Sequence, residues 1–350
     1  MPARLNEGQR ESFDSGLAPA AHLDMIGALA FRAVAAGSRL GVFAALADTE
    51  ATAEALADDL GLDRRGLTLL LDALAANGYL LRSETGYALS EGARRWLLPE
   101  GGFSVVAEFW SEVLAEQWDS LEDSIRTGTP AADFYGWLEE RPDMRERFHA
   151  MLAGIAESLS PAAVEALGPI SGHIVDVGGG HGAYATALLS ANPGTEATIV
   201  DLPGALEVAR ARVQQAGLAD RVHFVPADVT EPLDLPADTF SVALLFNMLH
   251  GFDGPANRRL LGSVHRSLRP DGRVAVVEQL AGGPPSDDLA GAFVSVFSLN
   301  LFHTQGGQAP HEDDLRGWLA DAGFVDVAAS PLRESAAEWL FVGSAGPRGE

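Results

Sequence analysis

Hydrophobic positions in the first hundred residues recur with a helical period. Residues 17–47 predict two helices rich in alanine and leucine, and the leucine period continues after them. Gly61 interrupts this period, and Asp63 has a side chain suited to cap the helix that follows. Residues 79–82 and 87–90 predict two short strands joined by a Glu-Thr-Gly turn. A helix-turn-helix followed by a β-hairpin is typical of a winged-helix domain.

From about residue 170 the pattern changes to short apolar runs that alternate with helical segments. Strands are predicted at HIVDVGG, ATIVDLP, VHFVPAD, FSVALLFNML, GRVAVVEQL and AEWLFVGSA. This alternation predicts an α/β domain with a parallel sheet covered by helices on both faces. The region between the two patterns is helical and rich in aromatic residues. We therefore expect three parts, which cover residues 1–100, 101–165 and 166–350.

Composition narrows the classes of function. The 350 residues include 24 basic and 49 acidic side chains, which gives a formal net charge of −25, and no cysteine. The absence of cysteine excludes disulfides, cysteine-ligated metals and a catalytic thiol. Residues 1–100 contain 9 arginines against 14 acidic residues. Because DNA affinity depends on the neutralisation of phosphates, the winged-helix pattern predicts packing or dimerisation rather than DNA binding.

The polar opening residues do not have the basic, apolar and cleavage regions of a secretory signal. The longest apolar stretch, residues 25–36, is too short and too charged to span a bilayer. We therefore expect a cytoplasmic protein.

A glycine-rich turn follows the first predicted strand of the α/β domain. Asp176 lies at the end of this strand, and Gly178, Gly180 and Ala183 match the dinucleotide pattern G-x-G-x-x-G/A. Glycine lets a ligand approach the backbone, at the edge where open α/β sheets bind ligands. A pyrophosphate gains nothing from the carboxylate of Asp176, whereas the ammonium group of S-adenosylmethionine can be received by it. The turn alone leaves both ligands open.

Two further carboxylates follow the next two predicted strands. Asp201 can accept both hydroxyls of a ribose, and Asp228 can accept an adenine amino group. Three acids at successive strand ends favour S-adenosylmethionine over the alternative that each acid caps a helix. The expected cofactor-binding residues are Asp176, Gly178, Gly180, Asp201, Leu202, Asp228, Val229 and Asn247.

In these motifs the chain resembles the class I S-adenosylmethionine-dependent methyltransferases. More closely, it resembles the small-molecule O-methyltransferase family, which includes plant caffeic acid O-methyltransferase and bacterial antibiotic-tailoring enzymes. The segments VDVGGGHG, VDLP, PAD and FNMLHGFDGPANRRLL carry the resemblance, in this order. It implies a winged-helix dimerisation domain in 1–100, a helical linker with substrate-pocket helices in 101–165, and a Rossmann-like catalytic domain in 166–350. It also implies a homodimer that acts on a small molecule, without a nucleic-acid or membrane partner.

The resemblance also implies the catalytic residues. The family's His-Asp-Trp segment corresponds to His250-Gly251-Phe252 here, so the histidine is kept and its neighbours differ. Glu278 has the spacing of the family's first acidic partner. Ala309 stands where the family's second acid lies in a Gly-Gly-x-Glu-Arg motif. We therefore expect His250 to act as the general base and Glu278 to orient it, while the substrate type stays open.

The expected reaction is methyl transfer to a hydroxyl oxygen of a small aromatic secondary metabolite. Candidate acceptor-binding residues are Met151, Met248, Phe297, Phe302 and His303. No metal is expected, although His250 and His303 are the pair that would hold one in a different reaction, C-methylation of an enolisable α-keto acid. A protein that binds the cofactor without methylating and a DNA-binding regulator are two further hypotheses for this chain.

Overall fold

The computed structural model describes residues 5–282, 289–333 and 337–347. The chain forms two compact units. One consists of Met1–Asp119 with Glu146–Met151, and the other of Ser120–Arg145 with Leu152–Glu350. The expected domain limits at residues 100 and 165 stay predictions.

The N-terminal unit is helical apart from one β-hairpin. Gly61 ends α4 in the left-handed conformation, with a φ of 66°, and the side chain of Asp63 caps α5 by accepting from the amide of Gly66. The predicted helix-turn-helix and hairpin are confirmed. The elements are α1 (Glu7–Asp14), α2 (Ala21–Arg39), α3 (Val42–Ala45), α4 (Ala53–Leu60), α5 (Arg64–Ala76), β1 (Leu80–Arg82), β2 (Tyr87–Leu89), α6 (Glu91–Trp96), η1 (Pro99–Gly101), α7 (Phe103–Glu116) and η2 (Trp118–Ser120).

Helix α1 has no counterpart in the hydrophobic pattern, because its residues are mainly polar and none of them is buried. A capping box begins it instead. The Asn6 side chain accepts from the Gln9 amide, and the Gln9 side chain accepts from the Asn6 amide. Capping, rather than an apolar stripe, marks the start of this helix.

The C-terminal unit is an α/β domain built on a seven-stranded sheet, and α10 (Pro142–Leu167) contributes to both units. Its other elements are α8 (Leu121–Thr127), α9 (Phe134–Glu140), β3 (His173–Val177), α11 (Ala183–Ala191), β4 (Glu196–Asp201), α12 (Pro203–Gln215), η3 (Ala219–Arg221), β5 (Val222–Pro226), β6 (Phe240–Phe246), η4 (Leu249–Gly251), α13 (Gly254–Ser267), β7 (Leu268–Gln279), α14 (Leu289–Gln305), α15 (Glu312–Asp321), β8 (Phe324–Pro331) and β9 (Glu338–Ala345).

The strand order is β5-β4-β3-β6-β7-β9-β8, and β3 to β7 are parallel. The predicted parallel sheet is confirmed for these five strands, whereas β9 runs antiparallel to both β7 and β8 at one edge. The sequence pattern also misses β8. This edge strand is mostly exposed, so it has no continuous apolar run that would reveal it.

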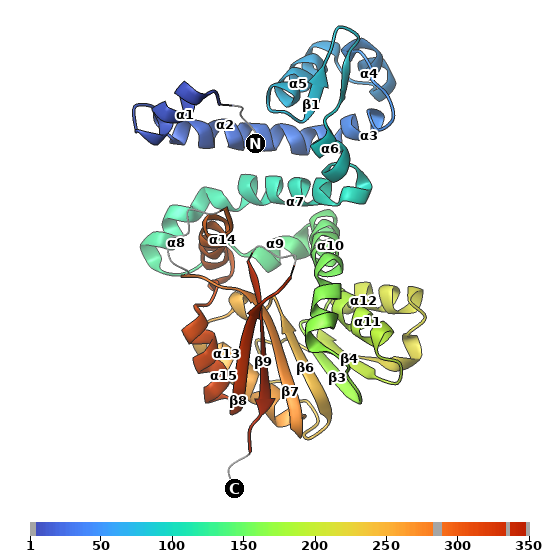
Figure 1. The fold of residues 1–350 in the computed structure, drawn as a ribbon, viewed down its shortest axis with the longest axis vertical. Helices are drawn as coiled ribbons and strands as arrows, with labels where there is room; N and C mark the ends of the chain where they lie inside the picture. Colours follow the sequence, from blue (N-terminus) through green and yellow to red (C-terminus); the bar gives the residue numbers. More distant parts are fainter. Residues whose placement is uncertain (1–4, 283–288, 334–336, 348–350) are drawn as a thin grey trace. The chain divides into compact units, whose positions relative to one another are not determined.

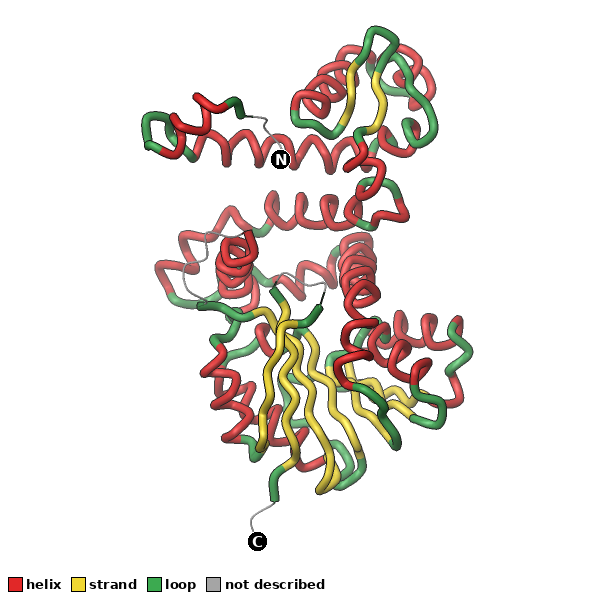
Figure 2. The backbone as a smooth tube through the Cα atoms, viewed as in Figure 1, coloured by secondary structure: helices red, strands yellow, loops and turns green. Residues whose placement is uncertain are grey.

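Helices cover the sheet on both faces, as predicted (Figure 1, Figure 2). Ile174, Ile199 and Leu244 face α10, α11 and α12, whereas Val175 and Leu245 face α13 and α15. The strand order reverses between β3 and β6, where connections leave in opposite directions. Ligands of open α/β sheets bind beyond the carboxyl ends of the strands at such a switch point.

Within the described ranges, one helix, α10, is long and apolar enough to cross a membrane by length and composition alone. The core helix of a globular protein passes the same test, so this is weak evidence for a membrane span.

Candidate active site

The turn after β3 brings the backbone against two carboxylates. Gly178 has a φ of 73°, in the left-handed region that favours glycine. A Cβ on Gly179 would lie 2.4 Å from Cγ of Asp176, and a Cβ on Gly180 would lie 2.7 Å from Oδ2 of Asp201. These approaches are too close for a side chain, so the turn needs its glycines.

Asp176 lies near the end of β3, with only 2% of its surface exposed. Burial, with a contribution from Asp201, raises the pKa of its carboxyl group to about 7. A buried carboxylate is stabilised by a nearby cation. This position therefore fits S-adenosyl-L-methionine, which carries a sulfonium and an ammonium group, and it does not fit a pyrophosphate.

Asp201 ends β4 and supports the glycine turn. Its Oδ2 accepts from the Gly180 amide at 2.8 Å, and its Oδ1 accepts from the Leu202 amide at 2.6 Å. Burial raises the pKa of Asp201, and the two backbone hydrogen bonds lower it again in part. Tyr135 of α9, which the sequence pattern did not single out, interacts electrostatically with this carboxylate.

Asp228 lies two residues beyond β5 and is exposed. Its Oδ1 accepts from the amide of Thr230 at 2.9 Å and from the hydroxyl of Thr230 at 2.6 Å. Both bonds use the same carboxylate oxygen. Val229 is half-buried against the α13 side of the sheet, and Leu202 is exposed. The surroundings of Asp228 thus differ from those of the buried Asp176 and the half-buried Asp201.

Asn247 and Met248 follow β6, and Met248 contacts the glycine turn. Asn247 has a φ of 52°, and its amide donates to the carbonyl of Val277 at 2.7 Å. In the part of the chain that the structure describes, its buried Oδ1 has no hydrogen-bond partner. A Cβ on Gly178 would lie 3.0 Å from the sulfur of Met248. The ends of β3 and β6 therefore meet at the switch point.

His250 and Glu278 form a hydrogen-bonded pair beside this turn. The Nδ1 of His250 lies 2.7 Å from Oε2 of Glu278, which is fully buried, and 14% of the histidine side chain is exposed. The other oxygen, Oε1, accepts from the Leu249 amide at 2.6 Å and from the His250 amide at 3.3 Å. Glu278 therefore holds both the imidazole ring and the short helix η4 that carries it.

A second side chain holds η4 from α13. The Nδ2 of Asn257 donates to the carbonyl of Leu249 at 2.9 Å and to that of Phe252 at 3.3 Å. Asn257 is completely buried. The sequence pattern does not reveal it, because a lone asparagine in a helical pattern carries no distinctive signal.

Comparison with known proteins identifies the family. Residues 118–325 match the O-methyltransferase domain, and residues 24–99 match the O-methyltransferase dimerisation domain. The chain belongs to the O-methyltransferase family. It is therefore a methyltransferase that depends on S-adenosyl-L-methionine, and its dimerisation domain suggests a homodimer.

Individual relatives agree with this assignment. The mitomycin biosynthesis 6-O-methyltransferase of Streptomyces lavendulae is 30% identical, over 88% of this chain and 90% of that protein. The structure of the mitomycin 7-O-methyltransferase MmcR has a TM-score of 0.81 and 25% identity, over 97% of this chain and all of that chain. PigF, solved with S-adenosylhomocysteine (SAH), has a TM-score of 0.80 and 25% identity, over 93% and 98% of the two chains.

The O-methyltransferase has a methyl group where the expected second acid would lie. Ala309 is buried, and its amide donates to Oγ of Ser298 at 3.1 Å. In the preceding turn, a Cβ on Gly307 would lie 2.0 Å from the carbonyl oxygen of His250. The turn therefore packs against the backbone of η4, and Glu278 is the carboxylate that contacts His250.

Helix α14 supplies an aromatic surface to the O-methyltransferase site. The ring of Phe297 meets His250 edge to face, with centroids 5.6 Å apart. Phe293, one turn earlier, stacks on Phe297 at 5.7 Å with 8° between the rings, and 47% of Phe293 is exposed. Phe302 is half-buried on the same helix. Phe297 and Phe302 are expected from the sequence, whereas Phe293 is not.

His303 is hydrogen-bonded to a residue of α8. It is completely buried in α14, and its Nδ1 lies 2.7 Å from the hydroxyl of Ser124 in α8. The same hydroxyl accepts from the amide of Ala131. Across the described ranges, no group of three or more histidine or acidic side chains is arranged to hold a metal ion.

Met151, an expected acceptor-binding residue, is buried in the part of α10 that belongs to the N-terminal unit.

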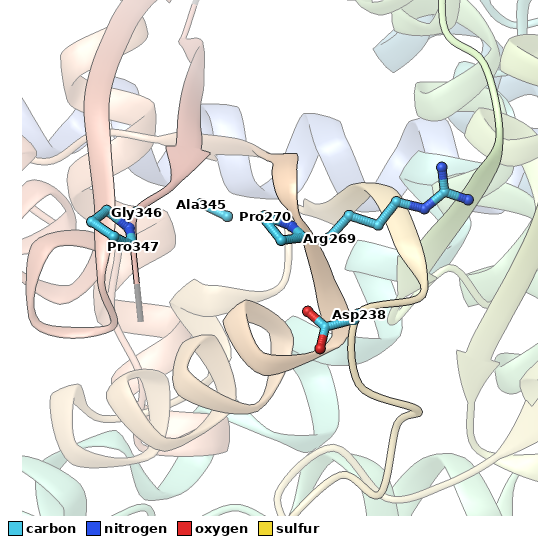
Figure 3. Close-up of a pocket in the computed structure, with 6 residues that line it drawn as sticks. All are labelled: Asp238, Arg269, Pro270, Ala345, Gly346 and Pro347. Carbon is cyan, nitrogen blue, oxygen red and sulfur yellow. The ribbon is translucent and has the colours of Figure 1, made fainter. Parts of the chain in front are cut away.

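A hollow of about 290 Å³ lies where β6 and β7 begin (Figure 3). The glycine turn follows the other, carboxyl end of the parallel strands. Asp238 and Arg269 line the hollow, and Nε of Arg269 donates to the carbonyl of Thr239 at 3.1 Å.

Proposed function

We propose that this O-methyltransferase methylates a hydroxyl oxygen of a small aromatic secondary metabolite, with His250 as the general base. The hydrogen bond of 2.7 Å between His250 Nδ1 and Glu278 carries the proposal. An ionised carboxylate only accepts hydrogen bonds, so Nδ1 bears the proton and Nε2 presents a lone pair. A hydroxyl group that reaches Nε2 can transfer its proton there.

Glu278 acts on the acceptor through His250. Its carboxylate fixes the tautomer and the orientation of the ring, and it stabilises the imidazolium that forms when the ring takes a proton. Its complete burial excludes water from this hydrogen bond, and the amides of Leu249 and His250 hold the carboxylate in place. One carboxylate is sufficient for these tasks, which fits the presence of Ala309 at the second position.

The cofactor-binding residues are proposed from the strand ends. When bound, S-adenosyl-L-methionine supplies an electrophilic methyl group on its sulfonium. Asp176 would face the cationic part and Asp201 the ribose hydroxyls, with Gly178 and Gly180 allowing close approach to the backbone. Asp228 would receive the adenine amino group. Leu202, Val229 and Asn247 complete the proposed set.

The aromatic character of the acceptor is proposed from α14. Phe297 and Phe293 present a stacked pair of rings beside His250, and a flat aromatic acceptor can stack or meet an edge there. Met151, Met248, Phe302 and His303 remain proposed acceptor-binding residues. The buried bond of His303 to Ser124 indicates that this histidine shapes α14 rather than reacts.

The test compares wild type with His250→Ala on a hydroxyl acceptor found by screening phenolic metabolites. Removal of a general base is expected to lower kcat by roughly 10²–10⁴-fold while the affinity for SAH stays the same. Calorimetry checks the affinity, and NMR of the product locates the methyl group. Full turnover by His250→Ala would show that His250 is not the base, and a methyl group on carbon would contradict the hydroxyl assignment.

A further inference from the structure

Three polar side chains gather on one face of the sheet, outside the residues assigned above. Tyr184 is in the first turns of α11, Gln279 ends β7, and Glu338 begins β9. Gln279 and Glu338 are paired in register, and Nε2 of Gln279 donates to Oε1 of Glu338 at 3.3 Å. Alternation along the strands places both on the same face as Val277 and Leu340, which pack with Tyr184 in the core under α10 to α12.

Two of these side chains have polar atoms without partners. Tyr184 is 5% exposed, and its hydroxyl has no hydrogen-bond partner among the residues that the structure describes. The same holds for the buried Oε1 of Gln279. A buried polar atom without a partner destabilises a protein, so native structures rarely retain one without a protein group, a water molecule or a ligand beside it. Two such atoms in one small region indicate that something polar binds there.

The charge of the region favours a cation. Tyr184 interacts electrostatically with the carboxylates of Glu338 and Asp176, so its hydroxyl lies in the field of two acidic groups. Burial raises the pKa of Glu338, and the nearby carboxylate of Glu278 adds to this effect. A bound positive charge would relieve the repulsion between these carboxylates and stabilise their charged forms.

We propose that Tyr184, Gln279 and Glu338 form a subsite that binds an ammonium group. A primary ammonium group has three N–H donors, and the subsite offers three acceptors: the Tyr184 hydroxyl, Oε1 of Gln279 and the Glu338 carboxylate. Gln279 directly follows Glu278 in β7, so the side chains of these two residues lie on opposite faces of the sheet. The group belongs either to the methyl acceptor or to the methionine part of the cofactor, and in both cases the inference rests on the proposed function.

Calorimetry on the full chain distinguishes the two sources. For the acceptor, tyramine and 3-hydroxybenzylamine are compared with their uncharged counterparts 4-ethylphenol and 3-cresol on SAH-saturated protein. For the cofactor, SAH is compared with 5′-methylthioadenosine, which has no ammonium group. We expect the charged member of at least one comparison to bind more tightly to wild type. That advantage should fall about ten-fold in Glu338→Gln, because hydrogen bonds to charged groups are strong.

Two further variants complete the test. Tyr184→Phe keeps the ring that packs against Phe246 and removes only the hydroxyl, so it should also reduce the advantage. Glu165→Gln removes an exposed carboxylate that pairs with Arg333 and should change nothing. If wild type binds SAH but no charged probe has an advantage that Glu338→Gln or Tyr184→Phe reduces, the subsite is wrong. If wild type does not bind SAH, the proposed function itself is wrong.

Discussion

At the scale of single residues, three aspartates with the same place in the sequence pattern have different surroundings. Asp176 is buried beside the glycine turn, Asp201 accepts two backbone amides, and Asp228 is exposed in a local turn with Thr230. The three carboxylates therefore differ in how far burial disfavours their charged form. Asp176 is the most buried, so its charge should affect both stability and ligand binding.

The replacement Asp176→Asn should change how stability depends on pH. The pKa of Asp176 is raised from 3.8 in the unfolded chain to about 7, so its contribution to stability is full below pH 4 and is lost as pH rises through 7. Asparagine does not titrate. Relative to wild type, the cofactor-free variant should gain about 2 kcal/mol in free energy of unfolding between pH 5.5 and 8. Urea denaturation measures these free energies. The same difference between variant and wild type at both pH values would contradict the prediction.

The replacement Glu278→Gln should impair catalysis and stability together. Glu278 accepts from two amides and from the His250 ring, whereas glutamine has one accepting oxygen, so at least one donor loses its partner. We expect kcat to fall roughly 10- to 100-fold and the free energy of unfolding to fall by about 1–3 kcal/mol. Steady-state kinetics and denaturation measure these changes, with the exposed Glu165→Gln as control. Wild-type turnover in Glu278→Gln would remove Glu278 from the mechanism.

At the scale of elements, the turn between β3 and α11 is the most constrained segment of the site. Its glycines let the backbone approach the carboxylates of Asp176 and Asp201. Helix α11 follows directly, and the sequence pattern predicts its bounds, Ala183–Ala191, because the mostly apolar segment AYATALLSA lies between Gly182 and Asn192. By contrast β8, an exposed edge strand, escapes the pattern.

Alanine at Gly180 should therefore disrupt cofactor binding. Its Cβ would lie 2.7 Å from Oδ2 of Asp201 and 3.0 Å from Cβ of Ala205. We expect SAH affinity to fall at least ten-fold and the free energy of unfolding to fall by about 1–3 kcal/mol. Gly204→Ala is the matched control, because no atom lies within 4 Å of a Cβ there. Equal SAH affinity in the two variants would show that the turn tolerates a side chain.

At the scale of the whole molecule, the chain combines a dimerisation domain with a methyltransferase domain. The first carries an acidic winged-helix pattern and the second an acidic ligand site. The net charge of −25 favours a cationic cofactor and disfavours the binding of a polyanion.

Cofactor and assembly can both be measured on the intact protein. Because the native state binds SAH and the unfolded chain does not, 100 times Kd of SAH should stabilise the protein by about 2.7 kcal/mol and raise Tm by several degrees. Thermal denaturation with and without SAH measures this, and adenosine is a suitable control. Sedimentation should give twice the mass of one chain. A monomer at micromolar concentration would contradict the homodimer.

The sequence by itself determined the element order apart from α1 and β8, the glycine turn and the family, since these follow from local period, turn chemistry and motif order. It also supplied His250 and Glu278 as a pair. Only the tertiary structure separated Asp176 from Asp228, reversed the direction of β9, and brought Tyr184 to Gln279 and Glu338. Burial and long-range pairing depend on residues far apart in the chain, and no local pattern records which of them meet.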